Sequence, residues 1–175
     1  TITNCIISDN NAGYRGGGFY SAFASQTITN NVINSIIIDN YANENGNGMY
    51  LNYNNYRILN SILINNGGNE IKGAGVTLNN CYIDPSKIMV SSLVSENNIF
   101  GGNLDFADQE NGDFHIGKDS VLIDAGTTSI EGISYPSFDF DGNKRISGSA
   151  IDIGPYEFIF DTDNGGLPWL MLLLD

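Results

Sequence analysis

A short motif recurs four times in the first 85 residues of this 175-residue chain. The copies begin at Asn4, Asn34, Asn60 and Asn80, with spacings of 30, 26 and 20 residues. The first three read Asn-Cys-Ile-Ile-Ser-Asp-Asn, Asn-Ser-Ile-Ile-Ile-Asp-Asn and Asn-Ser-Ile-Leu-Ile-Asn-Asn. A second landmark, Gly-Phe-Tyr or Gly-Met-Tyr, follows the first two copies by 14 residues. Self-similarity at such a period is typical of stacked repeats, in which each copy forms one turn of an array.

The residue types between these landmarks favour strands and turns. The chain contains 25 Asn and 21 Gly, which suit turns, and 23 Ile, which suits strands. No segment before residue 100 shows the 3.6-residue period of an amphipathic helix. Because the same motif returns once per repeat, each strand should pair in parallel with its copy in the next repeat, about 4.8 Å away. The sequence therefore predicts an all-β stack of coils.

Equivalent positions of the repeats should form columns along this stack. Asn tolerates the left-handed backbone that a coil corner requires, and stacked Asn side chains can hydrogen-bond along the stack. We expect one such ladder at Asn4, Asn34, Asn60 and Asn80, and a second at Asn10, Asn40 and Asn66. Strand side chains alternate in direction, so either the row of Ile6, Ile36 and Ile62 or the row of Ile7, Ile37 and Leu63 fills the interior.

The two cysteines provide a check on this arrangement. Cys5 and Cys81 occupy the same position of the first and fourth copies, where the second and third copies have Ser35 and Ser61. Three strand spacings put them about 14 Å apart. Because a disulfide needs Cα atoms within about 7 Å, both should be free thiols.

Charge excludes some partners. The chain has 20 acidic and 7 basic side chains, a net charge of −13 at pH 7. Residues 1–100 have a net charge of −2 and residues 101–175 a net charge of −11. Such a surface repels phosphate backbones and anionic membranes, so we expect no nucleic-acid partner. The longest apolar run, residues 167–174, is far short of the roughly 20 residues that span a bilayer, so we expect no membrane span.

Four motifs in the second half carry a family resemblance. They read Asn-Gly-Asp-Phe-His-Ile at 111–116, Val-Leu-Ile-Asp-Ala-Gly at 121–126, Asp-Phe-Asp-Gly-Asn-Lys-Arg at 139–145 and Asp-Ile-Gly-Pro-Tyr-Glu-Phe at 152–158. Their order and spacing resemble the C-terminal region of bacterial secreted right-handed parallel β-helix repeat proteins, including the choice-of-anchor Q domain proteins. The departures are Pro155, where Ala is usual, and Val121-Leu122, where Ser-Pro is usual.

The resemblance implies a right-handed parallel β-helix (β-solenoid) with a C-terminal cap, secreted or displayed at the cell surface. It implies no defined reaction. We expect coils over residues 1–97, the helix end with an acidic cap over 98–160 that closes the open sheet edges, and an apolar tail over 161–175. The tail is interpreted either as part of the cap or as a truncated sorting signal. Since the chain starts without Met inside a strand-like run, further coils of the same protein are expected upstream.

Tyrosines of the coil region are the first candidate site. Stacked aromatic rings on a flat sheet can hold sugar rings by apolar face contact and a phenol hydrogen bond. The residues expected to bind carbohydrate are Tyr20, Tyr50, Tyr53, Tyr56 and Arg57, of which Tyr20 and Tyr50 share a register. The alternative is that these tyrosines cover the sheet or lie in the interior.

A second candidate is a cation site. Asp139, Asp141 and Asn143, with Gly142 between them, have the oxygen-rich spacing of a calcium loop. The alternative is an Asp/Gly turn in which Arg145 pairs with a carboxylate. His115, the single histidine, alternates with Phe114 and Ile116, so it should face outward from a strand.

Two classes of function remain. The first is an extracellular or cell-surface protein with a structural, adhesive or glycan-binding role and polysaccharide as its partner, without catalysis. The second is a polysaccharide lyase or glycoside hydrolase of the β-helix type. A hydrolase needs two carboxylates about 5–9 Å apart. Asp9 and Asp39 stack on neighbouring turns, but Asn65 follows them in the third copy, which favours a corner ladder over a catalytic pair.

Overall fold

The computed structural model describes residues 1–21, 29–53 and 55–160. Within these ranges the fold is all-β, without an α-helix, and most strands belong to three parallel sheets. The first sheet contains β1 (Ile2–Thr3), β5 (Asn30–Ile33), β9 (Tyr56–Leu59), β12 (Val76–Asn79) and β15 (Leu93–Glu96). The second contains β2 (Ile6–Ser8), β6 (Ile36–Ile38), β10 (Ile62–Ile64) and β13 (Tyr82–Ile83). The third contains β4 (Phe19–Ser21), β8 (Met49–Leu51), β11 (Ile71–Gly73) and β14 (Ile88–Val90).

The remaining elements are short. β3 (Asn11–Ala12) pairs in parallel with β7 (Tyr41–Ala42), and β16 (Phe106–Asp108) pairs antiparallel with β17 (Asp113–Ile116). Two 3₁₀ turns, η1 (Pro85–Lys87) and η2 (Gln109–Asn111), follow β13 and β16. Among the described residues, no helix is long and apolar enough to cross a membrane.

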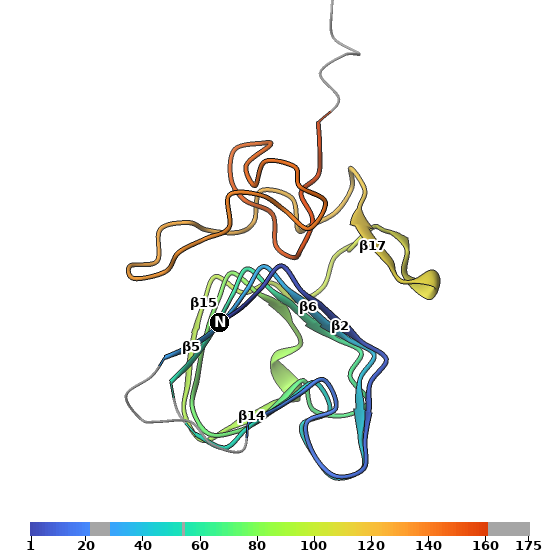
Figure 1. The fold of residues 1–175 in the computed structure, drawn as a ribbon, viewed down its shortest axis with the longest axis vertical. Helices are drawn as coiled ribbons and strands as arrows, with labels where there is room; N and C mark the ends of the chain where they lie inside the picture. Colours follow the sequence, from blue (N-terminus) through green and yellow to red (C-terminus); the bar gives the residue numbers. More distant parts are fainter. Residues whose placement is uncertain (22–28, 54, 161–175) are drawn as a thin grey trace, which may run out of the picture.

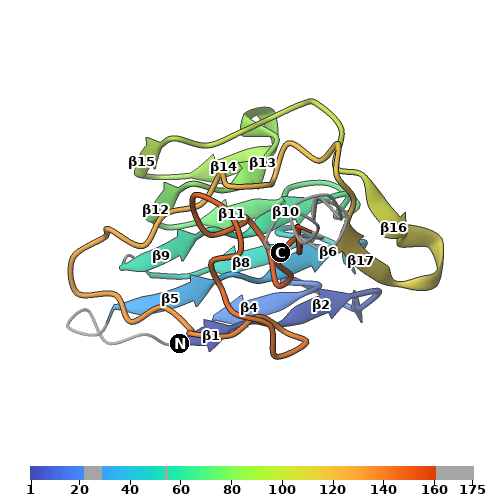
Figure 2. The same ribbon diagram turned by 90° about the horizontal axis from the view of Figure 1, so that it is seen from above.

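Equivalent residues of the repeats are paired, as the motif spacing predicted. Ile36 pairs with Ile6 on one side and with Ile62 on the other, and Ile62 pairs with Tyr82. Each of the first four repeats adds one strand to each of the three sheets, so the strands lie over one another around a shared interior (Figure 1). The stack is seen from the side in Figure 2. The predicted all-β class with parallel pairing is confirmed.

The structure decides which isoleucine row faces inward. Ile37 and Leu63 are completely buried in the interior with residues from the other two sheets, such as Ile58 and Met49. The row of Ile36 and its partners points to the outer face of the second sheet. In this outward row Ile36 and Ile62 are also buried and Ile6 is half-buried, which requires a second layer of protein outside the coils.

Both corners of the second sheet use the left-handed backbone. The φ angles of Asn4, Asn34, Asn60 and Asn80 lie between 47° and 50°. Those of Asp9, Asp39 and Asn65, at the next corner, lie between 55° and 57°. Asn and Asp are the non-glycine residues that adopt this conformation most readily. The interpretation of Asp9 and Asp39 as corner residues agrees with this geometry.

The second asparagine ladder forms as predicted. The Asn10 amide nitrogen donates to the Asn40 side-chain oxygen at 2.9 Å, and Asn40 donates to Asn66 at 2.9 Å. Asn66 in turn donates to the Glu70 carboxylate at 2.5 Å, where the ladder ends. Cys5 and Cys81 are free thiols, as their separation along the stack predicted.

The first asparagine ladder has a different role from the one expected. Its side chains do not bond along the stack but donate to backbone carbonyls of the C-terminal segment, residues 98–160. Asn34 donates to Asp152 at 3.2 Å, and Asn80 donates to Ala125 at 2.7 Å. Asn60 makes a two-point contact, donating to the Thr127 carbonyl at 2.8 Å and accepting from the Thr127 amide at 2.9 Å. These four asparagines therefore attach the C-terminal segment to the coils. We call the set of Asn4, Asn34, Asn60 and Asn80 the docking rail.

The C-terminal segment lies beside the coils, so the expectation that it closes their far end is wrong. Figure 1 shows it outside the ring of strands, next to β2 and β6. Its apolar side chains, including Phe114, Leu122 and Ile153, pack with the outward isoleucines of the second sheet. At the far end, β15 is exposed along its whole length. The physical reason is that β6 and β10 are apolar on both faces, and the outer face must be covered. The predicted tail, 161–175, lies outside the described residues.

Candidate functional site

Tyr20 and Tyr50 lie side by side on the outer face of the third sheet. They are paired in register on β4 and β8, and their ring centroids are 5.8 Å apart with an interplanar angle of 32°. Lys72 and Met89 continue the same outward row on β11 and β14. Tyr20 is 46% exposed and Tyr50 is half-buried, and we call these two residues the aromatic row.

Arg15 extends the aromatic row sideways. Its guanidinium carbon lies 4.6 Å from the Tyr14 ring centroid and 4.9 Å from that of Tyr50, which are cation–π distances. The same side chain donates to the Tyr50 hydroxyl at 3.2 Å and pairs with Glu44 at 3.3 Å. These contacts fix the position of Tyr50 and place positive charge beside the rings, although the chain as a whole is strongly acidic.

The other predicted carbohydrate residues do not join this row. Tyr56 is only 4% exposed, packs in the interior, and hydrogen-bonds to the Ser21 hydroxyl, so its assignment to a surface site is wrong. Successive strand residues face opposite sides, which sends Tyr56 inward and Arg57 outward. Tyr53 is half-buried in the bend after β8. Arg57 lies on the outer face of the first sheet, on a different side of the coils from Tyr20.

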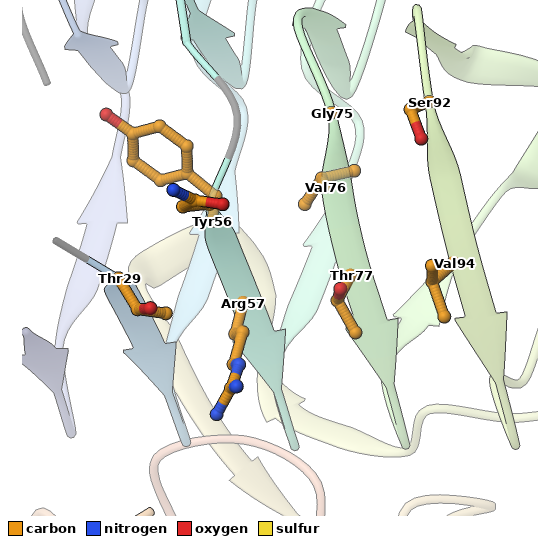
Figure 3. Close-up of a pocket in the computed structure, with 9 residues that line it drawn as sticks. Thr29, Tyr56, Arg57, Gly75, Val76, Thr77, Ser92 and Val94 are labelled. Atoms are coloured by element: carbon orange, nitrogen blue, oxygen red, sulfur yellow. The ribbon is translucent and has the colours of Figure 1, made fainter. Parts of the chain in front are cut away.

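Arg57 borders a hollow of about 330 Å³ on the outer face of the first sheet. Arg57, Thr77 and Val94 are paired in register across β9, β12 and β15 and form part of its wall. Figure 3 shows their side chains, with those of Thr29 and Ser92, on neighbouring parts of this face. A second hollow, of about 450 Å³, shares Arg57, Thr77 and Val94 and extends to Glu96, Ile130 and Glu131. We call the first of these the Arg57 pocket.

The predicted calcium loop is a closed turn. Asp139 is 6% exposed, and its Oδ1 accepts from the backbone amides of Asp141 at 2.9 Å and Asn143 at 2.8 Å. Its Oδ2 accepts from the Asn143 side chain and from the amide of Glu157, both at 3.1 Å. Burial acts to raise the pKa of Asp139, but these N–H donors outweigh it and hold the pKa low. The carboxylate is thus saturated by donors, which is the geometry of the alternative turn and does not support calcium.

Arg145 and Glu157 form a buried pair beside that turn, as the same alternative required. Their N–O distance is 3.2 Å, and both side chains are almost completely buried. The other guanidinium nitrogen donates to the Asn4 side-chain oxygen at 2.5 Å, which ties the C-terminal segment to the first coil. Burial raises the pKa of Glu157 to about 7, with the nearby charge of Asp152 adding to the effect. Among the described residues, no group of three or more His, Cys, Asp or Glu side chains could hold a metal ion.

His115 faces outward, as predicted, but its partners were not foreseen. Its Nδ1 lies 2.5 Å from Asp113, its Nε2 lies 2.6 Å from Asp141, and its ring stacks on Tyr156 at 3.9 Å. Burial acts to lower the pKa of His115, but the hydrogen bonds to the two aspartates raise it. The cluster fastens β17 to the 139–143 turn. The i, i+2 spacing of Asp113 and His115 on a strand was the available sequence signal.

A third hollow contains the stacked corner carboxylates. It has a volume of about 780 Å³ and is lined by Asp9, Asp39 and residues 109–112. Burial raises the pKa of Asp39, with the charge of Asp9 adding to the effect and a hydrogen bond from Gln109 opposing it.

Comparison with known proteins adds no further constraint. Neither a protein-family model, nor a curated protein, nor a solved structure matches the chain. The resemblance to choice-of-anchor Q domain proteins therefore stays a prediction.

Proposed function

We propose that this protein is part of an extracellular right-handed parallel β-helix that binds polysaccharide without cleaving it. The parallel pairing of equivalent residues across three sheets supports the β-helix. The observation that carries the binding role is the accessible pair of Tyr20 and Tyr50, paired across adjacent strands 5.8 Å apart. Solenoids commonly use their extended side surfaces for binding.

The chemistry of this row suits a sugar chain. A tyrosine ring offers an apolar face to the C–H groups of a sugar and a hydroxyl that can donate or accept. The Tyr20 hydroxyl accepts from Asn52 at 3.4 Å, and Arg15 and Lys72 add donors on either side of Tyr50. Because the rings stand on paired strands, their spacing is fixed by the sheet, and little side-chain freedom is lost on binding.

The test is affinity electrophoresis of the 175-residue chain through gels containing neutral or acidic polysaccharides. We expect retardation in at least one gel, and loss of most of it in Tyr20→Ala and Tyr50→Ala. Tyr41→Ala is the matched control, because Tyr41 is equally exposed, at 47%, but lies on β7 away from the row. Unretarded wild-type protein, or equal losses in Tyr20→Ala and Tyr41→Ala, would refute the proposal.

One observation favours a glycoside hydrolase as the second candidate. Asp9 and Asp39 occupy equivalent positions on adjacent turns, whose backbones are about 4.8 Å apart, and both line one hollow, which brings two carboxylates together as a glycoside hydrolase requires. The raised pKa of Asp39 would suit a general acid. Release of reducing ends that Asp39→Asn abolishes would establish this function in place of simple binding. A polysaccharide lyase would instead generate an unsaturated uronate, detected by its ultraviolet absorbance.

A further inference from the structure

Among the residues that the structure describes, Arg57 has no counter-ion, although the protein has 20 acidic side chains. None of the ion pairs among the described residues includes Arg57. The pairs that form are Arg15 with Glu44, Lys87 with Glu70, Lys118 with Asp119, Arg145 with Glu157, and His115 with Asp113 and Asp141. Within residues 1–21, 29–53 and 55–160, the Arg57 guanidinium also has no hydrogen-bond acceptor. An arginine left unpaired at the edge of a pocket is available to a ligand.

The Arg57 pocket has the lining of a small-ligand site. Thr29, Thr77 and Ser92 contribute hydroxyl groups, and Val94, which is 50% exposed, contributes an apolar surface. Gly75, which follows β11 and precedes Val76, lines the pocket with its backbone (Figure 3). A few placed polar groups on an apolar wall are typical of sites that orient a small molecule.

The sheet holds these groups in fixed positions. Arg57 pairs with Thr77, and Thr77 pairs with Val94, through continuous parallel ladders. The neighbouring residue on β9, Tyr56, is anchored in the interior by its hydroxyl, which fixes the backbone beneath Arg57. A guanidinium presents two parallel N–H donors whose spacing matches the two oxygens of a carboxylate or a sulfate.

The acidic residues nearby limit where a negative group can bind. Glu96 and Glu131 line the adjoining hollow, on the other side of Arg57 from Thr29 and Ser92. Asn79 donates to Glu96 at 3.1 Å, which holds that carboxylate in place. A ligand anion is therefore repelled from the part of the second hollow that the two glutamates line and is attracted to Arg57, while uncharged hydroxyl groups of the same ligand can hydrogen-bond to the glutamates.

From this arrangement we infer that the Arg57 pocket binds the oxyanion of an acidic sugar, with a uronic acid carboxylate as the primary ligand and a sulfate ester as the alternative source. Arg57 receives the anion, the Thr77 and Ser92 hydroxyls bind ring oxygens, and Val94 contacts the C–H face. The inference extends the proposed polysaccharide binding to a second face of the coils and names its chemical class.

The experiment is an NMR titration of the isotope-labelled 175-residue chain with glucuronate, glucose, glucose 6-sulfate and acetate. Glucuronate should shift the Arg57 side-chain N–H signal and the signals of Thr77 and Val94, whereas glucose at equal concentration should not. Arg57→Gln should weaken glucuronate binding about tenfold or more, because charge-assisted hydrogen bonds are lost. Arg57→Lys keeps the positive charge but lacks the two parallel N–H donors. Its affinity for glucuronate should therefore lie between those of the wild type and Arg57→Gln. Lys118→Gln is the matched control: it removes one exposed cation, whose side chain is 78% exposed and which lies in the C-terminal segment, and it should bind as the wild type does.

The outcomes separate this inference from the proposed function. Stronger binding of glucose 6-sulfate than of glucuronate at Arg57 would assign the site to sulfated sugars. Equal binding of acetate and glucuronate, or unchanged glucuronate affinity in a folded Arg57→Gln variant, would overturn the inference. In the gel assay, retention that depends on Tyr20 and Tyr50 but not on Arg57 would leave the polysaccharide-binding proposal standing while this inference fails.

Discussion

The docking rail gives the most specific prediction. Replacing Asn60 with Ala removes both hydrogen bonds to Thr127 and places Ala in the left-handed region, where φ is 48°. The backbone cost is about 1 kcal/mol. Each lost hydrogen bond to a part-buried partner costs about 1 kcal/mol more. The free energy of unfolding should therefore fall by about 3 kcal/mol.

Asn65→Ala provides the matched control. Asn65 has nearly the same backbone, with φ of 56°, but its side chain is exposed and docks nothing in the described structure. Its replacement should lower the free energy of unfolding only by the cost of Ala in the left-handed backbone, about 1 kcal/mol. Urea unfolding followed by circular dichroism measures both values, and limited proteolysis should show faster cleavage within residues 124–157 only for the Asn60 variant. Equal losses in the two variants would refute the docking role of Asn60.

Two further predictions concern the C-terminal segment and the coils. Since the pKa of Glu157 is raised to about 7 from its usual value of 4.5, the folded state binds its proton more tightly than the unfolded state does. The free energy of unfolding should therefore fall as pH rises from about 4.5 to about 7, by about 3 kcal/mol, and Glu157→Gln should lack that part of the pH dependence in urea titrations. In Gly73→Ala, the new Cβ would lie 1.9 Å from the Leu51 carbonyl oxygen at φ of 133°, so we expect a loss of about 3 kcal/mol or more. Gly132→Ala, with φ of 74° and open space around its Cβ, should lose about 1 kcal/mol, and similar losses in both would contradict the close approach at Gly73.

The repeat made the pairing of the coils predictable. A motif that returns once per turn fixes which residues are neighbours, so the register of Ile6 with Ile36 and of Tyr20 with Tyr50 follows from the spacing alone. The path of the C-terminal segment does not follow from a period, because its contacts are long-range and non-repeating. Its location had one sequence signal, the unbroken apolar runs of β6 and β10, which indicate strands buried on both faces.

The candidate site was predictable only where it followed the repeat. Tyr56 and Arg57 were assigned to one surface although neighbouring strand residues face opposite sides, and alternation alone excludes one of them. The hollow beside Arg57 is lined by residues from several strands, which no single repeat contains. The saturation of Asp139 by N–H donors depends on the distant amide of Glu157, so the calcium interpretation could not be rejected from local spacing.

The register of the coils is tested most directly by a distance along the stack. Spin labels at Tyr20→Cys and Met89→Cys, in a chain whose native cysteines are replaced by the serine found in the middle repeats, report on two exposed positions of one outward row. Three strand spacings separate them, about 14 Å, so electron paramagnetic resonance should show strong dipolar broadening. Spectra of the doubly labelled protein that equal the sum of the two singly labelled spectra would contradict the stacked arrangement.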